Sequence, residues 1–211
     1  MELKGKTILI TGGTAGIGLQ AAKQFSEAGC KVVITGRSQG KLDEAKKALP
    51  MVTAIKSDIA NATDALSLFK QVKAMGGIDI LYNNAGILHV SKNLGMANDD
   101  HLQAATQEME VNYLGVIRLN NLFMDMLKSR KEGAIINTTS ILSYVPSLIE
   151  ATYSASKTAL GFYTQALRQH LSIINSKLKV FELLPPVVAT EMTAGRISKK
   201  LSPEDLVKSL I

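Results

Sequence analysis

Tyr153 and Lys157 are the residues whose types and spacing point most directly to chemistry. Because four positions separate them, a helix would place both side chains on one face, one turn apart. A nearby ammonium favours the phenolate, and lowering a phenol pKa from about 10 toward about 7 needs about 4 kcal/mol. The pair could then exchange a proton with a carbonyl or alcohol oxygen, and Ser140 could donate a hydrogen bond to that oxygen. Taken alone, this spacing also fits a surface contact on a helix.

A glycine-rich turn gives the second signal. Residues 11–18 (TGGTAGIG) directly follow an apolar run and open an amphipathic segment. Glycines permit a sharp turn and a close ligand, and the free N–H groups of the following helix stabilise a pyrophosphate. Such a turn can serve close packing alone, but a strand before it and a helix after it favour a dinucleotide site. The turn residues expected at that site are Gly12, Thr14, Gly16, Ile17 and Gly18.

Arg37 and Ser38 indicate which dinucleotide is bound. They follow the second apolar run, at the place where an acidic residue would bind the 2′-hydroxyl of an NAD ribose. No acidic residue stands there, whereas arginine can hold a 2′-phosphate through two hydrogen bonds and Ser38 adds a donor. The sequence therefore predicts NADP(H) in preference to NAD(H). The alternative is that Arg37 is a solvated residue leading into the next helix.

The scaffold that must position these residues is predicted by the apolar pattern. Short β-rich runs at 7–10, 31–35, 52–56, 78–81, 134–137 and 179–183 alternate with helical segments at 17–28, 41–49, 63–75, 100–130 and 153–175. Repeated β-α-β units with right-handed crossovers give an α/β fold, a doubly wound parallel sheet of the Rossmann type in three layers. No linker divides the chain, so we expect residues 1–211 to form a single NAD(P)-binding domain that includes the catalytic site.

Composition narrows the classes of partner. Of 211 residues, 46% are hydrophobic and 20% charged, which is typical of a folded globular domain. The net charge of +6 comes from scattered basic residues, so no nucleic acid is expected; it fits a phosphate-bearing ligand or simple solubility. The sequence has one cysteine and lacks both a signal-peptide core and an apolar run long enough to cross a bilayer. These features predict a soluble, cytoplasmic protein that does not associate with a membrane. His89, His101 and His170 lack ligand spacing, so no metal is expected.

Taken in order, these motifs resemble the short-chain dehydrogenase/reductase family in its compact single-domain form. Besides the glycine turn, the resemblance rests on Asp58, the run Asn83-Asn84-Ala85-Gly86, Asn112, Ser140, the run Tyr153-Ser154-Ala155-Ser156-Lys157 and residues 185–190. The resemblance implies a catalytic set of Asn112, Ser140, Tyr153 and Lys157. In that set Lys157 would also bind the nicotinamide ribose, and Asn112 would hold a water that joins Lys157 to solvent.

The resemblance also implies cofactor contacts. Asp58 would meet the adenine, Asn84 and its neighbours would support the cofactor and the central strand, and Thr190 would hold the nicotinamide carboxamide. Beyond the glycine turn, the cofactor-binding residues are expected to be Arg37, Ser38, Asp58, Ile59, Asn84, Ala85, Gly86, Tyr153, Lys157, Pro185, Val188 and Thr190.

Two features depart from the family pattern. Pro185-Pro186 stands where Pro-Gly is usual, which restricts the backbone and is similar to a bacterial branch of the family found beside teichoic-acid D-alanylation genes. Residues 201–211 read as a helix leading into a seventh strand, which we expect to be missing. The long segments 100–130 and 153–175 could bury one face on the sheet and another on a second subunit, predicting a homo-oligomer; purely intramolecular packing is the alternative.

The sequence thus predicts an NADP(H)-dependent oxidoreductase that interconverts a carbonyl and an alcohol on a small molecule by hydride transfer, with Tyr153 as general acid and base. The alternative is a catalytically silent NADP-binding regulatory or scaffold protein on the same fold. A structural dimerisation module would leave the glycine turn unexplained. Met96 and Met192, in segments expected to flank the site, could form an apolar wall for a lipophilic carbonyl or could simply fill the core.

Overall fold

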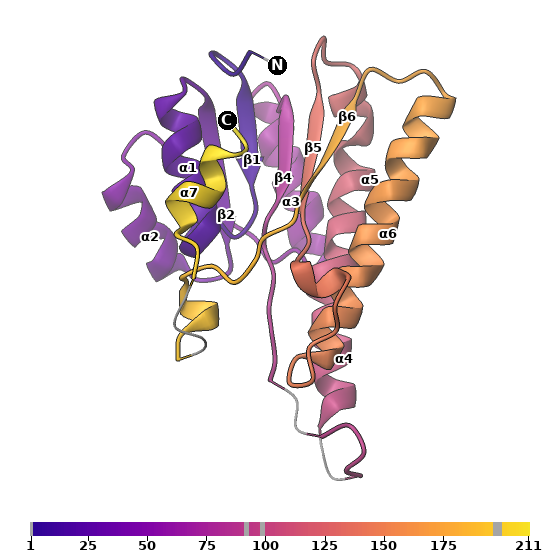
Figure 1. Cartoon of the computed structure of the whole chain (residues 1–211). Helices are drawn as coiled ribbons and strands as arrows, with labels where there is room; N and C mark the ends of the chain where they lie inside the picture. Colours follow the sequence, from indigo (N-terminus) through magenta and orange to yellow (C-terminus); the bar gives the residue numbers. More distant parts are fainter. Residues whose placement is uncertain (1, 91–92, 98–99, 196–199) are drawn as a thin grey trace.

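Short strands and longer helices alternate along the chain (Figure 1). The computed structural model describes residues 2–90, 93–97, 100–195 and 200–211. The strands are β1 (Thr7–Ile10), β2 (Lys31–Gly36), β3 (Thr53–Lys56), β4 (Ile80–Asn83), β5 (Ala134–Thr138) and β6 (Lys179–Leu183). The α-helices are α1 (Gly16–Glu27), α2 (Gln39–Ala48), α3 (Ala62–Ala74), α4 (His101–Met109), α5 (Gly115–Lys128), α6 (Ala151–Ile173) and α7 (Pro203–Lys208). Shorter turns are the π-helical η1 (Glu110–Leu114) and the 3₁₀ turns η2 (Ile141–Ser143) and η3 (Glu191–Thr193).

The strands form one parallel sheet in the order β3-β2-β1-β4-β5-β6. The chain builds outward from β1 in one direction through β2 and β3, and in the other through β4, β5 and β6. The order reverses between β1 and β4, and ligands of such sheets bind outside the carboxyl ends of the strands at this point. The predicted doubly wound α/β fold is therefore confirmed.

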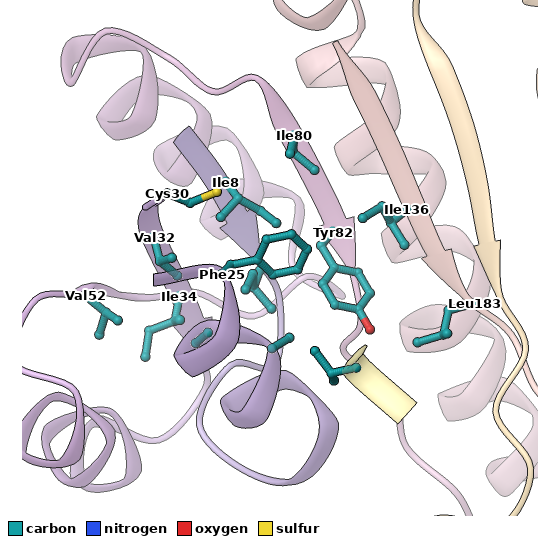
Figure 2. Packing of buried hydrophobic residues seen from close by; sticks show 14 of the residues in the cluster. Ile8, Phe25, Cys30, Val32, Ile34, Val52, Ile80, Tyr82, Ile136 and Leu183 are labelled. Carbon is teal, nitrogen blue, oxygen red and sulfur yellow. The ribbon is translucent and has the colours of Figure 1, made fainter. Parts of the chain in front are cut away.

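Each face of the sheet carries its own hydrophobic cluster. Ile8 and Ile10 of β1 pack with α1, α2 and α7, whereas Leu9 between them packs with α3, α5 and α6. Helices cover both faces, which is why consecutive residues in the middle of the central strands are apolar and do not alternate with polar residues. Figure 2 shows the first cluster, in which Phe25 of α1 lies among side chains of the central strands, including Tyr82 of β4.

The predicted helix 100–130 contains a π-helical turn. α4 ends at Met109, η1 spans Glu110–Leu114 and α5 begins at Gly115. A Cβ at Gly115 would lie only 3.0 Å from the Ile59 carbonyl oxygen, so the helix approaches the segment after β3 closely at this point. Such turns widen an α-helix by one residue and are frequent at functional sites; this one carries Asn112.

β4 begins and ends two residues later than the predicted strand 78–81. The backbone of Ile78 is bonded to side chains: its N–H donates to Met126 Sδ at 3.4 Å, and its carbonyl oxygen accepts from Arg130 Nε at 2.9 Å. Apolar character alone therefore placed the start of this strand too early.

The predicted helix 201–211 is wrong at both ends. α7 starts at Pro203, after Ser202, whose Oγ accepts from the Asp205 N–H at 3.0 Å. Leu201 is extended and pairs with the segment after β6: its N–H donates to the Val187 carbonyl at 3.0 Å, and its own carbonyl accepts from Ala189 at 2.9 Å. This pairing tethers the segment that closes the candidate site. None of the described helices is both long enough and apolar enough to span a membrane.

Candidate active site

A cavity of about 960 Å³ opens at the carboxyl ends of the strands, between the glycine turn after β1 and the segment after β6. Nearly all the predicted site residues line it: Gly12, Thr14, Gly16, Ile17, Arg37, Ser38, Asp58, Ile59, Asn84, Ala85, Gly86, Ser140, Tyr153, Lys157, Pro185, Val188 and Thr190. Gly18 and Asn112 are the two predicted residues outside this lining. The segments that follow all six strands thus meet α6 at one place.

The glycine turn is tight because its glycines are required. Gly12 and Gly16 have φ values of 64° and 51°, in the left-handed region that side chains disfavour. A Cβ at Gly18 would lie 2.2 Å from the Gly12 carbonyl oxygen, so Gly18 serves packing within the turn and does not face the cavity. A Cβ at Gly16 would lie 3.0 Å from Thr190 Cγ2, which places the segment after β6 directly against the turn.

Thr11 and Asn84 lock the end of β4 onto this turn. Thr11 Oγ1 accepts hydrogen bonds from the backbone N–H groups of Asn84 and Ala85, each at 3.0 Å. The Asn84 side-chain amide donates to the carbonyl oxygens of Thr11 at 3.0 Å and Gly12 at 3.3 Å. Asn84 therefore supports the cradle, as the resemblance implied, while the role of Thr11 was missed by sequence reasoning.

Two basic residues line the end of the cavity at β2. Arg37 was predicted, and Lys41, in the first turn of α2, was not. Lys41 Nζ also forms an ion pair with Glu191 Oε2 of η3 at 3.2 Å, across the mouth of the cavity. Ser38 Oγ accepts from the Lys41 N–H at 3.4 Å as the N-cap of α2. The spacing of Arg37 and Lys41 was the available signal for a second cation here.

Tyr153 and Lys157 of α6 meet Ser140, which follows β5. Lys157 Nζ lies 5.7 Å from the centre of the Tyr153 ring and donates to the Thr138 carbonyl oxygen at 2.8 Å. Ser140 Oγ accepts from the Leu142 N–H at 3.2 Å, and the side chains of Ser140 and Tyr153 are hydrogen-bonded. The predicted juxtaposition of phenol, ammonium and hydroxyl is thus present in the structure.

The predicted lowering of the phenol pKa is wrong for the protein's own groups. Burial raises the pKa of Tyr153 to about 12, against a lowering by the Ser140 hydrogen bond and a further rise from the Glu108 charge. Burial also lowers the pKa of Lys157 to about 8. The reason is desolvation: both side chains are more than nine-tenths buried, and the neutral form of each is favoured in such surroundings. Tyr153 is therefore a protonated phenol at neutral pH.

Asn112 is held within the protein and does not line the cavity. Its Oδ1 accepts from the Ile87 N–H at 2.9 Å, and its Nδ2 donates to the Ile87 carbonyl at 2.9 Å and to Ser156 Oγ at 3.0 Å. A Cβ at Gly86 would lie 3.2 Å from Asn112 Oδ1 and 3.4 Å from Lys157 Nζ. Asn112 therefore fixes the segment after β4 against α6, close to Lys157.

Glu108 is a buried carboxylate that sequence reasoning missed. It has no exposed surface, and its Oε1 accepts from the His89 N–H at 2.7 Å, with His89 Nδ1 at 3.5 Å. Its position one helical turn before Asn112 was the available signal. Glu108 and Asn112 together hold residues 87–89. Among the described residues, no group of three or more His, Cys, Asp or Glu side chains is arranged to hold a metal ion.

A doubly wound sheet with a glycine cradle at its reversal point defines the class of Rossmann-type dinucleotide-binding proteins. Within that class, the short chain dehydrogenase model matches residues 6–201. The chain belongs to this family of oxidoreductases.

Relatives and solved structures agree with this family. The chain is 35% identical over 192 residues to the uncharacterized oxidoreductase DltE of Bacillus subtilis (strain 168), covering 90% of this chain and 74% of that protein. A short chain dehydrogenase from Burkholderia cenocepacia J2315, in complex with NADP, superposes with a TM-score of 0.87 at 31% identity, covering 99% and 83%. The 3-ketoacyl-(acyl-carrier-protein) reductase of Brucella melitensis, complexed with NADH, gives 0.90 at 27% identity, covering 99% and 90%.

Proposed function

We propose that this protein is an NADP(H)-dependent reductase that converts a carbonyl to an alcohol, with Tyr153 as the general acid. The observation that carries the proposal is the buried Tyr153 phenol, bonded to Ser140 and beside Lys157, in the same cavity as the glycine turn. NADPH, when bound, supplies the hydride from its nicotinamide C4. The glycine turn suits its pyrophosphate, because Gly12 and Gly16 line the cavity without side chains at the start of α1.

Tyr153 supplies the proton at its hydroxyl oxygen. A carbonyl that gains a hydride becomes an alkoxide, which is far more basic than a phenolate, so a phenol with a pKa of about 12 is a competent donor. Ser140 Oγ is already an acceptor for the Leu142 N–H, which leaves its own proton to orient toward Tyr153 or the substrate oxygen. Lys157, mostly charged below its pKa of about 8, stabilises the phenolate left after transfer.

The direction follows from the same groups. Oxidation of an alcohol needs Tyr153 as a base, and only a small fraction of a phenol with this pKa is ionised at pH 7. Reduction needs the protonated form, which is the form that burial favours. We therefore infer that the free enzyme is poised for carbonyl reduction.

The experiment that tests this function removes the hydroxyl group from each of two tyrosines on the same helix. In Tyr153→Phe we expect NADPH-dependent ketone reduction to fall about 10²- to 10⁴-fold, with NADPH affinity nearly unchanged. Tyr163→Phe is the matched control, because Tyr163 also accepts a hydrogen bond, from Asn120 at 3.3 Å, but lies outside the cavity lining. Equal turnover in both variants would favour the silent binding protein instead.

The preference for NADP(H) is supported by Arg37 and Lys41, two cations that line the β2 end of the cavity. The family does not decide the matter, because the two similar solved structures hold NADP and NADH. We expect Arg37→Ala to weaken NADPH about tenfold or more and NADH little, because one charge-assisted hydrogen-bonding group is lost. Fluorescence titration measures both, with the exposed α2 residue changed in Lys46→Ala as control; an equal loss for both nucleotides contradicts the assignment.

Assembly and location stay predictions. Leu114 and Phe162, on the two long helical segments, are 40% and 71% exposed, which supports a homo-oligomer built through these segments. A cytoplasmic location is consistent with the absence of a membrane-spanning helix among the described residues.

A further inference from the structure

We propose that the substrate is a neutral carbonyl compound with an apolar chain, held along a hydrophobic wall at the end of the cavity beyond Tyr153. This inference rests on the proposed function and deepens it by naming the substrate class. The wall is formed by Leu88, Ile141, Leu142, Ile149 and Met192, all of which line the cavity.

Three separate segments contribute to this wall. Leu88 follows β4, and the connection between β5 and α6 contributes Ile141 and Leu142 of η2 and Ile149, two residues before α6. Met192 comes from η3 after β6 and is 42% exposed. The sequence left Met192 as either a wall residue or core filler, and its exposed position in the cavity lining favours the wall.

The charged residues of the cavity gather elsewhere. Six charged residues line it: Arg37, Lys41, Asp58, Glu150, Lys157 and Glu191. Arg37, Lys41 and Asp58 lie at the nucleotide end, and Lys41 is paired with Glu191. Lys157 donates to the Thr138 carbonyl. Among the lining residues that the structure describes, no further lysine or arginine stands beside the hydrophobic wall.

This distribution separates substrate classes. Binding of a keto acid or a sugar phosphate needs a cation or a set of donors for the anion. The described lining residues offer no such cation beside the wall. An aliphatic chain against Leu142 and Ile149, in contrast, would gain free energy with every methylene that it buries.

The loop between η2 and α6 extends the apolar surface outward. Tyr144, Val145, Leu148 and Ile149 are 59%, 60%, 94% and 54% exposed. Such a run of exposed apolar side chains is costly in water unless something covers it. The apolar chain of a substrate longer than the cavity would cover the part of this run next to Ile149.

The test is a homologous series of straight-chain alkan-2-ones, from butan-2-one to decan-2-one, with saturating NADPH. We expect kcat/KM to rise about two- to fourfold for each methylene until the wall is filled. The 2-oxo acids of equal length should be reduced at least a hundredfold less efficiently. Ile149→Gln should flatten the dependence on chain length, whereas Ile174→Gln, at a residue 58% exposed and outside the cavity lining, should leave it unchanged.

Binding to Tyr153→Phe separates this inference from the proposed function. Calorimetry with the same ketones and NADPH measures the affinity of this variant for each ketone without turnover. Reduction that is independent of chain length, or that favours the oxo acids, overturns the substrate class while the reductase stands. If ketone binding strengthens with chain length but the wild type reduces none of the ketones, the proposed reductase function is overturned and the apolar binding wall stands. If the protein neither binds nor reduces the ketones, both the reductase and the substrate class are overturned.

Discussion

Lys157 is the residue whose replacement tests the energetics of the site most sharply. The residue is 3% exposed, and its ammonium donates a hydrogen bond to the Thr138 carbonyl oxygen. Lys157→Met keeps the unbranched length of the side chain and removes the charge. We expect the variant to lose turnover, because the Tyr153 phenolate is left without its neighbouring cation. We also expect the free energy of unfolding of the variant to be higher than that of the wild type at neutral pH.

The magnitude follows from the pKa of Lys157, about 8 in the folded protein against 10.5 for an exposed lysine. Because the folded value is the lower one, the unfolded chain binds more protons between those two values. The contribution of Lys157 to the free energy of unfolding is therefore unfavourable below about pH 8 and rises with pH across this window. At pH 7 the penalty is about 3 kcal/mol, and at pH 9.5 about 1 to 1.5 kcal/mol remains.

Urea unfolding of both proteins at pH 7 and pH 9.5 measures this contribution. The stability of Lys157→Met relative to wild type should fall by about 2 kcal/mol between the two pH values. The loss of the hydrogen bond to Thr138 shifts both differences equally, and Cys30 and Tyr153 titrate in both proteins. A difference that does not change with pH, or that grows with pH, would refute the argument that burial holds the pKa of Lys157 down.

Two further predictions concern neighbours of the site. Glu108→Gln should lower the pKa of Tyr153 by removing a nearby negative charge, so alcohol oxidation at pH 9 should speed up while ketone reduction at pH 7 is unchanged; no gain in oxidation would count against this coupling. Gly18→Ala should destabilise the protein by about 1 to 3 kcal/mol and abolish NADPH binding, because its Cβ would collide with the Gly12 carbonyl. Gly40→Ala in α2 is the control, since its Cβ would meet nothing closer than 4.0 Å and should be neutral or slightly stabilising in thermal unfolding.

The fold was predictable from the sequence because most strands are short and predominantly apolar, and segments with helical periodicity separate them. What failed were features set by tertiary contacts. The π-helical turn at Glu110–Leu114 lies beside the close approach of Gly115 to Ile59, a tertiary contact that no apolar pattern records. Leu201 reads as helical but pairs with the segment after β6, because Val187 and Ala189 offer it backbone partners.

The positions of the site residues were predictable from motifs, but their electrostatics were not. Tyr153, Lys157 and Ser140 lie together as their spacing and order indicated. The pKa of Tyr153 depends on how deeply the helix buries it and on the Glu108 charge, and both depend on the packing of α4 against α6. Lys41 was missed because its proximity to the cavity follows from the orientation of α2.

The most direct test of the central claim is transfer of a labelled hydride. NADPH carrying deuterium at the transferable C4 position is incubated with the protein and a straight-chain alkan-2-one, and the alcohol is analysed by mass spectrometry and NMR. We predict deuterium on the carbinol carbon with the wild type and with Tyr163→Phe, and at least a hundredfold less labelled alcohol with Tyr153→Phe. Labelled alcohol formed equally fast by Tyr153→Phe, or alcohol that carries no deuterium, would contradict the account.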